Sequence, residues 1–118
     1  MTTAMMPGFE VELVRGITVI RFTLDSLHEE NFEDVSEGLR VLILEQRPRR
    51  VVVDLGSIRQ IDDLGLAMVQ SFHDSIEEIG GTAILCRLNS STMASLSQSG
   101  LDRLLHIRPS LNEAIWTF

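Results

Sequence analysis

The feature that most constrains the fold is a short apolar segment in the middle of the chain, Val51-Val52-Val53, which ends at Asp54. Three consecutive β-branched residues favour a strand, and the absence of polar alternation indicates that both faces of that strand are buried. Strands of this kind lie at the centre of parallel sheets that helices cover on both sides. The sequence therefore predicts an α/β fold around a central strand at residues 50–55.

Strand and helix patterns alternate along the rest of the chain. Two segments on either side of Arg15-Gly16 predict an antiparallel hairpin, and apolar residues at three- and four-residue intervals predict helices. Consecutive strands and helices at this spacing form right-handed crossovers on a mainly parallel sheet, to which the hairpin adds an antiparallel edge. The predicted order is β-β-α-β-α-β-α-β-α, with strands at 9–13, 17–22, 50–55, 82–88 and 104–107.

Capping residues mark the expected starts of the helices. Ser26 and Glu29 have the spacing of a capping box, which predicts that the first helix begins there and continues to Arg47. Asp62 or Asp63 is expected to cap the second helix, because a carboxylate at a helix start accepts hydrogen bonds from free N–H groups. The apolar face of this helix, which we expect to cover the central strand, comprises Met68, Phe72 and Ile76.

The size and composition of the chain fit one domain. Of its 118 residues, 44% are apolar, which is enough to fill one hydrophobic core without a disulfide or a metal ion. We place the domain at residues 9–118 and expect residues 1–8 to form a flexible N-terminal segment. The single cysteine, Cys86, lies within an apolar strand, so we expect its thiol to be buried and unreactive.

The charge balance argues against several classes of partner. The 10 basic and 17 acidic residues give a net charge of −7, which repels nucleic-acid phosphates and anionic lipid. No apolar run approaches the roughly 20 residues that cross a bilayer, so we expect no membrane insertion. Residues 1–8 lack the basic and apolar regions of an export signal, which predicts a cytoplasmic protein.

The sequence offers little support for metal binding or catalysis. His28, His73 and His106 are far apart and share no metal-ligand spacing, so we predict no metal ion and no other cofactor. The serines have no nucleophile motif around them. We therefore expect a protein without enzymatic activity.

Three aspartates are expected near the carboxyl edge of the sheet, where open α/β folds bind their ligands: Asp54, Asp62 and Asp63. Three interpretations are open, namely a divalent-cation pocket, an acid–base pair for catalysis, and a simple helix cap. Apolar neighbours such as Ile61 and Leu64 provide no further polar ligand or catalytic group. A cap alone contributes about 0.5 to 2 kcal/mol of stability.

A series of short motifs resembles one known family. The series runs through residues 53–55 (VDL), 61–66 (IDDLGL), 80–85 (GGTAIL), 99–101 (SGL) and 110–114 (SLNEA). In this order and spacing the motifs are similar to those of the STAS domain of bacterial anti-sigma factor antagonists, and the likeness extends from about Phe9 to the C-terminus. The resemblance implies a domain that binds an anti-sigma factor, usually a serine kinase of the histidine-kinase-like ATPase superfamily, and so frees a sigma factor.

The sequence departs from this family at residues 63 and 64, and of the family's Gly-x-Leu-Asp turn before the first helix only Leu24-Asp25 is present. In the family, the motif before the second helix reads Asp-Ser-Ser/Thr-Gly-Leu, and the kinase phosphorylates the first serine to break the complex. Asp62, Gly65 and Leu66 match this motif, whereas Asp63 occupies the phosphoacceptor position and Leu64 the next one. An aspartate offers no hydroxyl group, so the resemblance implies a binding module that serine phosphorylation does not switch at this motif.

The resulting hypothesis places partner binding around the start of the second helix, at Asp25, Asp62, Asp63, Leu64, Gly65 and Leu66. The expected partner is an anti-sigma factor or a serine-kinase-like regulator. We expect the Asp63 carboxylate to use the free amides at the helix start and thus to be a partial, permanent mimic of phosphoserine. Two alternatives stay open: an acidic-pocket signalling domain that binds a cation or a phosphoryl group, and a subunit of a larger STAS assembly such as a stressosome or a transporter complex. The oligomeric state is left open.

Overall fold

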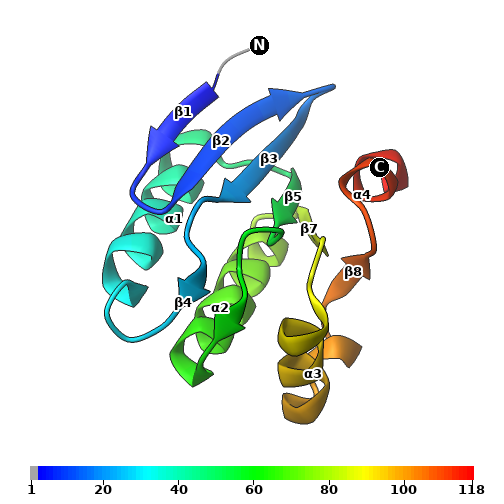
Figure 1. The fold of residues 1–118 in the computed structure, drawn as a ribbon. Helices are drawn as coiled ribbons and strands as arrows, with labels where there is room; N and C mark the ends of the chain where they lie inside the picture. The colour runs from blue at the N-terminus through cyan, green and yellow to red at the C-terminus, as the bar shows by residue number, and fades with distance from the viewer. Residues whose placement is uncertain (1–2) are drawn as a thin grey trace.

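The computed structural model describes residues 3–118 and contains a six-stranded sheet with helices on both faces (Figure 1). In spatial order the strands of this sheet are β1 (Thr3–Met6), β2 (Phe9–Val14), β3 (Ile17–Phe22), β5 (Arg50–Asp54), β7 (Thr82–Cys86) and β8 (His106–Arg108). Two further short strands, β4 (Ser26–Leu27) and β6 (Gln60–Ile61), pair with each other. The helices are α1 (Phe32–Gln46), α2 (Asp63–Glu78), α3 (Ser90–Ser99) and α4 (Leu111–Thr117), with a short 3-10 helix, η1 (Leu101–Arg103), after α3.

The strand β5 lies at the centre of the sheet, as the sequence predicts. It pairs in parallel with β3 on one side and with β7 on the other, and Val51, Val52 and Val53 are at most 3% exposed. The hairpin strand β2 runs antiparallel to β3. The mixed, mainly parallel α/β fold with an antiparallel edge is therefore confirmed.

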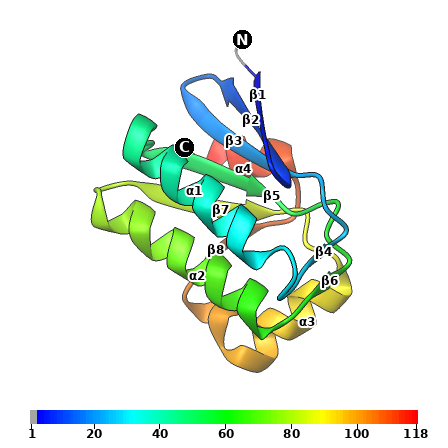
Figure 2. The same ribbon diagram turned by 90° about the vertical axis from the view of Figure 1, so that its left-hand side faces the viewer.

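The two faces of the sheet carry cores of different size. Helices α1 and α2 lie side by side on one face, and α4 lies on the other (Figure 2). Val51 and Val53 belong to the larger core together with Phe72 of α2, which is 6% exposed. Val52 belongs to the smaller core with Ala114 of α4. Because alternate side chains of a strand point to opposite faces, the run of valines fills both cores.

The predicted flexible segment at residues 1–8 contains a strand. Residues 1 and 2 lie outside the described part, while Thr3–Met6 form β1 and pair antiparallel with β2. The turn between these strands places Gly8 at φ +87°, a backbone conformation that favours glycine. Without β1, the outer edge of β2 would expose a row of unpaired backbone groups. This pairing extends the folded domain to residue 3, beyond the boundary predicted at residue 9.

The first helix begins later than the capping-box spacing predicts. Helix α1 begins at Phe32, and Ser26 instead belongs to β4, which pairs in parallel with β6. Asn31 stabilises the turn between β4 and α1, because its side chain accepts a hydrogen bond from the N–H of His28 and donates one to the carbonyl oxygen of Ser26. The predicted helix start at Ser26 is therefore wrong. A distant strand, invisible in the local pattern, pairs with this segment.

The other elements follow the predicted order, with small shifts at their ends. The last strand was expected at residues 104–107 but occupies His106–Arg108. The turn of η1 extends to Leu105, because the N–H of Leu105 donates to the carbonyl oxygen of Leu101. The strand therefore begins only after that turn. Between residues 3 and 118, no helix has both the length and the apolar character needed to span a membrane.

Candidate functional site

Three segments that are distant in the sequence meet at one edge of the molecule: β4 with the turn after it, β6, and the first turn of α2. The backbone N–H of Asp62 donates to the carbonyl oxygen of Leu27 at 3.0 Å and so extends the pairing of β4 with β6. The carbonyl oxygen of Asp25 accepts a hydrogen bond from the N–H of Arg59 at 2.6 Å. We call this surface, formed by residues 25–29 and 59–64, the α2 edge.

Asp62 joins these segments through its side chain. Its Oδ1 accepts a hydrogen bond from the N–H of Gly65 at 2.9 Å and thereby caps α2. Its Oδ2 accepts a hydrogen bond from the N–H of Glu29 at 3.1 Å, in the turn that precedes α1. Of the two aspartates considered as the helix cap, Asp62 fulfils that role.

Asp63 is the first residue of α2, and its side chain is exposed. The N–H groups of Gly65 and Leu66 bond to the side chain and the carbonyl oxygen of Asp62, respectively. These two amides are therefore occupied by Asp62, and the expectation that Asp63 uses the amides at the helix start does not hold for them. Its carboxylate still lies at the positive end of the helix macrodipole, which favours a negative charge.

The next three residues of α2 occupy different environments. Leu64 is 41% exposed, whereas Leu66 is 7% exposed and belongs to the larger core. Gly65 is buried, and a Cβ atom there would lie 2.7 Å from Cγ1 of Ile61 and 2.8 Å from the carbonyl oxygen of Leu27. Glycine thus lets α2 approach β4 and β6 closely. The predicted partner-binding residues that are exposed are Asp25, Asp62, Asp63 and Leu64, while Gly65 and Leu66 shape the edge from beneath.

A shallow hollow of about 310 Å³ lies in the α2 edge. Strands β4 and β6 and the turns beside them form most of its lining, and Ser91 of α3 contributes the remainder. Helix α3 therefore belongs to the same surface, which the sequence motif around Asp62 does not reveal.

Asp54 does not join the other two aspartates. It is 1% exposed, and its Oδ2 lies 3.3 Å from Nε of Arg21 and 3.5 Å from Nη1 of Arg87. Its Oδ1 accepts a hydrogen bond from the N–H of Gly56 at 2.9 Å. These groups compensate the buried charge, so Asp54 ties the end of β5 to its neighbouring strands. Within residues 3–118, no group of three neighbouring His, Cys, Asp or Glu side chains includes any of the three aspartates.

Cys86, at the end of β7, is fully buried in the smaller core, as predicted. Burial raises the pKa of its thiol to about 12, and the nearby negative charge of Asp54 acts in the same direction. The thiol therefore keeps its proton near neutral pH. A protonated, buried thiol is neither a nucleophile nor a metal ligand.

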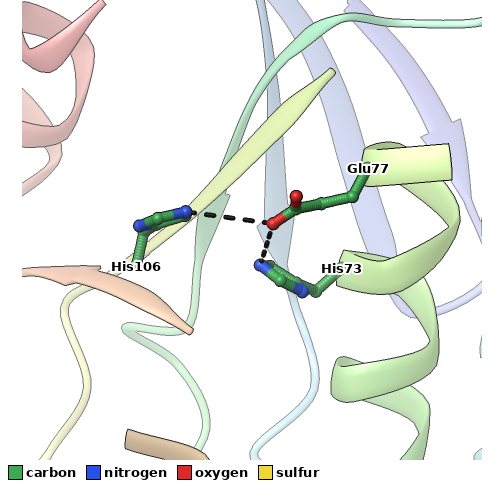
Figure 3. A group of neighbouring side chains, drawn as sticks. All are labelled: His73, Glu77 and His106. Atoms are coloured by element: carbon green, nitrogen blue, oxygen red, sulfur yellow. Dashed lines mark ion pairs between the residues drawn. The ribbon is translucent and has the colours of Figure 1, made fainter. Parts of the chain in front are cut away.

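Two histidines that are far apart in the sequence lie side by side (Figure 3). The ring centroids of His73 in α2 and His106 in β8 are 5.8 Å apart, and Glu77 lies next to both. The separation of His73 and His106 in the sequence therefore does not keep them apart in the fold. Sequence spacing does not reveal this group, because it forms only when α2 packs beside the sheet and its C-terminal half comes next to β8. The available signal was the four-residue spacing of His73 and Glu77 on one helix face.

Comparisons with known proteins identify a family and solved structures that share this fold. The family model of the STAS domain matches residues 9–114. A proposed anti-sigma factor antagonist from Thermotoga maritima superposes with a TM-score of 0.82 at 23% identity, over 92% of this chain and 92% of that chain. An anti-sigma-factor antagonist (STAS) domain protein from Planctomyces limnophilus gives 0.82 at 20% identity, over 92% and 95%. The Bacillus cell fate determinant SpoIIAA in its phosphorylated form gives 0.68 at 20% identity, over 91% and 96%; at these identities the likeness establishes the fold.

Proposed function

Because the chain belongs to the STAS domain family, we propose that it is a non-enzymatic binding module of a bacterial partner-switching pathway. The partner we infer is an anti-sigma factor or a serine-kinase-like regulator. We infer that this chain and its partner are both located in the cytoplasm. Solved structures of similar fold are named as anti-sigma factor antagonists, which supports this class of partner.

One observation carries the proposal: an exposed leucine follows exposed acidic side chains at the α2 edge. Leu64 is 41% exposed directly after Asp63, and Asp25 lies on the neighbouring loop. Protein interfaces combine apolar anchors with a polar rim, and an exposed leucine is available as such an anchor. The carboxylates beside it favour a partner surface with basic side chains.

The regulation that we infer differs from that of the family motif. When Asp62 is aligned with the motif aspartate, Asp63 takes the place of the phosphoacceptor serine. A serine kinase has no hydroxyl group to modify there, so the charge at this position is constant. A phosphoserine would carry about −1.5 to −2 charges, more than a carboxylate does. Asp63 thus shares the sign of a phosphoserine's charge but not its magnitude, and the N–H of Gly65 donates to Asp62 and not to Asp63.

A partner of this chain therefore has to tolerate a permanent negative charge at the start of α2. A basic side chain opposite Asp63 would do so, because complementary charges across an interface favour the correct pairing and raise the association rate. We infer that the interface selects partners by this charge rather than releasing them by phosphorylation.

Affinity measurements with purified anti-sigma factors and serine-kinase-like regulators of the native host test the proposal. Asp63→Lys reverses the charge in the first turn of α2 and is expected to weaken binding by about tenfold or more. The matched control, Glu113→Lys, makes the same change in the first turn of α4, on the opposite face of the sheet, and should bind like the wild type.

Two outcomes would contradict the proposal. Equal affinity of wild type and Asp63→Lys would move the interface away from the α2 edge. Failure of every such regulator to bind the wild-type chain would exclude the proposed class of partner.

A further inference from the structure

A second group of side chains, shown in Figure 3, lies in the C-terminal half of α2 and at the start of β8. Nε2 of His73 is 3.0 Å from Oε1 of Glu77, and Nε2 of His106 is 3.9 Å from the same oxygen. One donor atom from each residue lies within 4.8 Å of the other two. We call these three residues the His–Glu–His group.

His73 is the buried member of this group, with a side chain that is 7% exposed. Its Nδ1 is 3.1 Å from Oδ1 of Asp74. A carboxylate accepts hydrogen bonds and does not donate them, so a neutral ring that donates this bond carries its proton on Nδ1 and has a lone pair on Nε2. The ring is thus oriented by a carboxylate on one nitrogen and open for a ligand on the other.

The contact between Nε2 of His73 and Oε1 of Glu77 is an ion pair only when the imidazole ring is protonated. The two atoms are 3.0 Å apart, yet within the described residues the buried Nε2 has no hydrogen-bond partner. The geometry therefore does not fit an N–H···O bond. Two electron-pair donors that approach each other without a proton between them are stabilised by a cation that both can face.

We propose that His73, Glu77 and His106 bind one divalent transition-metal ion, and that Zn²⁺ is the ion that fits this donor set. Two imidazole nitrogens and one carboxylate oxygen favour zinc over magnesium and calcium, which prefer oxygen ligands. Tetrahedral zinc with bonds of about 2.0 to 2.1 Å holds its donor atoms about 3.3 Å apart. The separations of 3.0 and 3.9 Å lie on either side of this value.

The exposure of the other two ligands sets the character of the site. The side chains of Glu77 and His106 are 50% and 52% exposed, so both can turn toward an ion near the fixed His73. Solvent reaches the same point and can supply the fourth ligand, as in zinc sites with three protein ligands. Asp74 acts as a positioning residue, because a carboxylate on the second nitrogen of a metal-binding histidine fixes the ring. The site is therefore open and reversible.

An ion bound here would connect two elements that lie far apart in the sequence. His73 and Glu77 come from α2, and His106 begins β8, a three-residue strand at the edge of the sheet. An ion that binds only the folded chain stabilises it in proportion to the logarithm of the ion concentration. The helical rise of about 1.5 Å per residue places Glu77 about 20 Å from Asp63, so this site is separate from the α2 edge.

Calorimetric titration of the full chain with a zinc salt, after removal of any affinity tag, tests the proposal near neutral pH. Wild type is expected to bind one Zn²⁺ per chain. His106→Gln and Glu77→Gln, both at exposed positions, are expected to weaken this binding by about tenfold or more. His28→Gln and Glu78→Gln are the matched controls, a histidine elsewhere and the next carboxylate on α2, and should bind like the wild type.

Asp74→Asn probes His73 without changing the buried ring, whose own replacement could unfold the chain. It is expected to weaken zinc binding about tenfold to hundredfold. At saturating Co²⁺ it should leave the visible spectrum of the bound ion unchanged, whereas His106→Gln, which removes a ligand, should change that spectrum. Absence of one-to-one Zn²⁺ binding by the wild type, equally tight Mg²⁺ binding, or wild-type affinity in His106→Gln would overturn the proposal. None of these outcomes bears on partner binding at Asp63, so the two proposals fail independently.

Discussion

The carboxylate of Asp62 accepts a hydrogen bond at 3.1 Å from the backbone N–H of Glu29, which lies 33 residues earlier in the chain. The same carboxylate caps α2 through the N–H of Gly65 at 2.9 Å. One side chain thus fixes the start of α2 and the turn before α1. The α2 edge depends on Asp62 for its shape, whereas Asp63 contributes charge.

Asp62→Ala is expected to lower the free energy of unfolding by about 1 to 2 kcal/mol, because loss of a helix cap alone costs about 0.5 to 2 kcal/mol and a second backbone amide loses its partner. Asp63→Ala removes a carboxylate that does not cap the helix and should change stability by less than about 0.5 kcal/mol. Urea unfolding of both variants measures the difference. Equal losses would show that the two aspartates share the cap.

Phe72 anchors α2 over β5, and Phe72→Ala is expected to cost about 3 to 5 kcal/mol of unfolding free energy as a truncation in the core. The side chain is 6% exposed and lies in the larger core with Val53. Ser71→Ala, at the preceding exposed position, is the control and should be nearly neutral. A loss below about 1 kcal/mol for Phe72→Ala in denaturant unfolding would contradict this packing.

Sequence patterns predicted the elements that are specified by residues within one continuous segment. The valine run of β5 and the apolar face of α2 each fall within one continuous segment, so periodicity alone locates them. The short strands β1, β4 and β6 are different, because each is defined by pairing with another segment. At Ser26 this pairing overrides a local capping-box pattern.

The candidate site divides in the same way. Asp62, Asp63 and Leu64 are consecutive, so one motif identifies them. The role of Asp54 could not be predicted, because Arg21 and Arg87 reach it from the two neighbouring strand segments. Grouping of the two histidines likewise requires the packing of α2 beside β8, which no residue spacing encodes.

Cys86 makes part of the stability dependent on alkaline pH. The folded chain raises the pKa of this thiol from its ordinary value of 9.0 to about 12, so the folded state keeps a proton that the unfolded chain loses. Its contribution to stability is therefore complete below about pH 9 and is lost as the pH rises toward 12. The unfolding free energy of Cys86→Ala, measured between about pH 9 and 12, should lack the decrease that this thiol causes in the wild type. Reaction of the native thiol with a disulfide reagent as fast as in urea would contradict its burial.

Asp63→Ser tests the inferred loss of the phosphorylation switch, and it rests on the proposed function. Wild type incubated with ATP and the serine-kinase-like regulators of its host should carry no phosphate within residues 61–66. The variant restores a hydroxyl group while Asp62 keeps the cap, so we expect phosphate at residue 63 by mass spectrometry. Leu64→Ser places the hydroxyl one residue later and is the control, expected to remain unmodified. Phosphate on the wild-type segment would refute this interpretation.

Leu64→Ala separates a role in the interface from a role in the core, when stability and partner affinity are measured on the same sample. Leu64 is 41% exposed, so its truncation should cost less than about 1 kcal/mol of stability while binding weakens by more than about 1 kcal/mol. Leu44→Ala truncates a leucine that is 59% exposed on α1, outside the α2 edge, and should leave affinity unchanged. The opposite pattern for Leu64→Ala, a large loss of stability with unchanged affinity of the folded molecules, would make Leu64 the top of the core. In that case the acidic side chains alone would carry the interface, and Asp63→Lys would remain the stronger perturbation of binding.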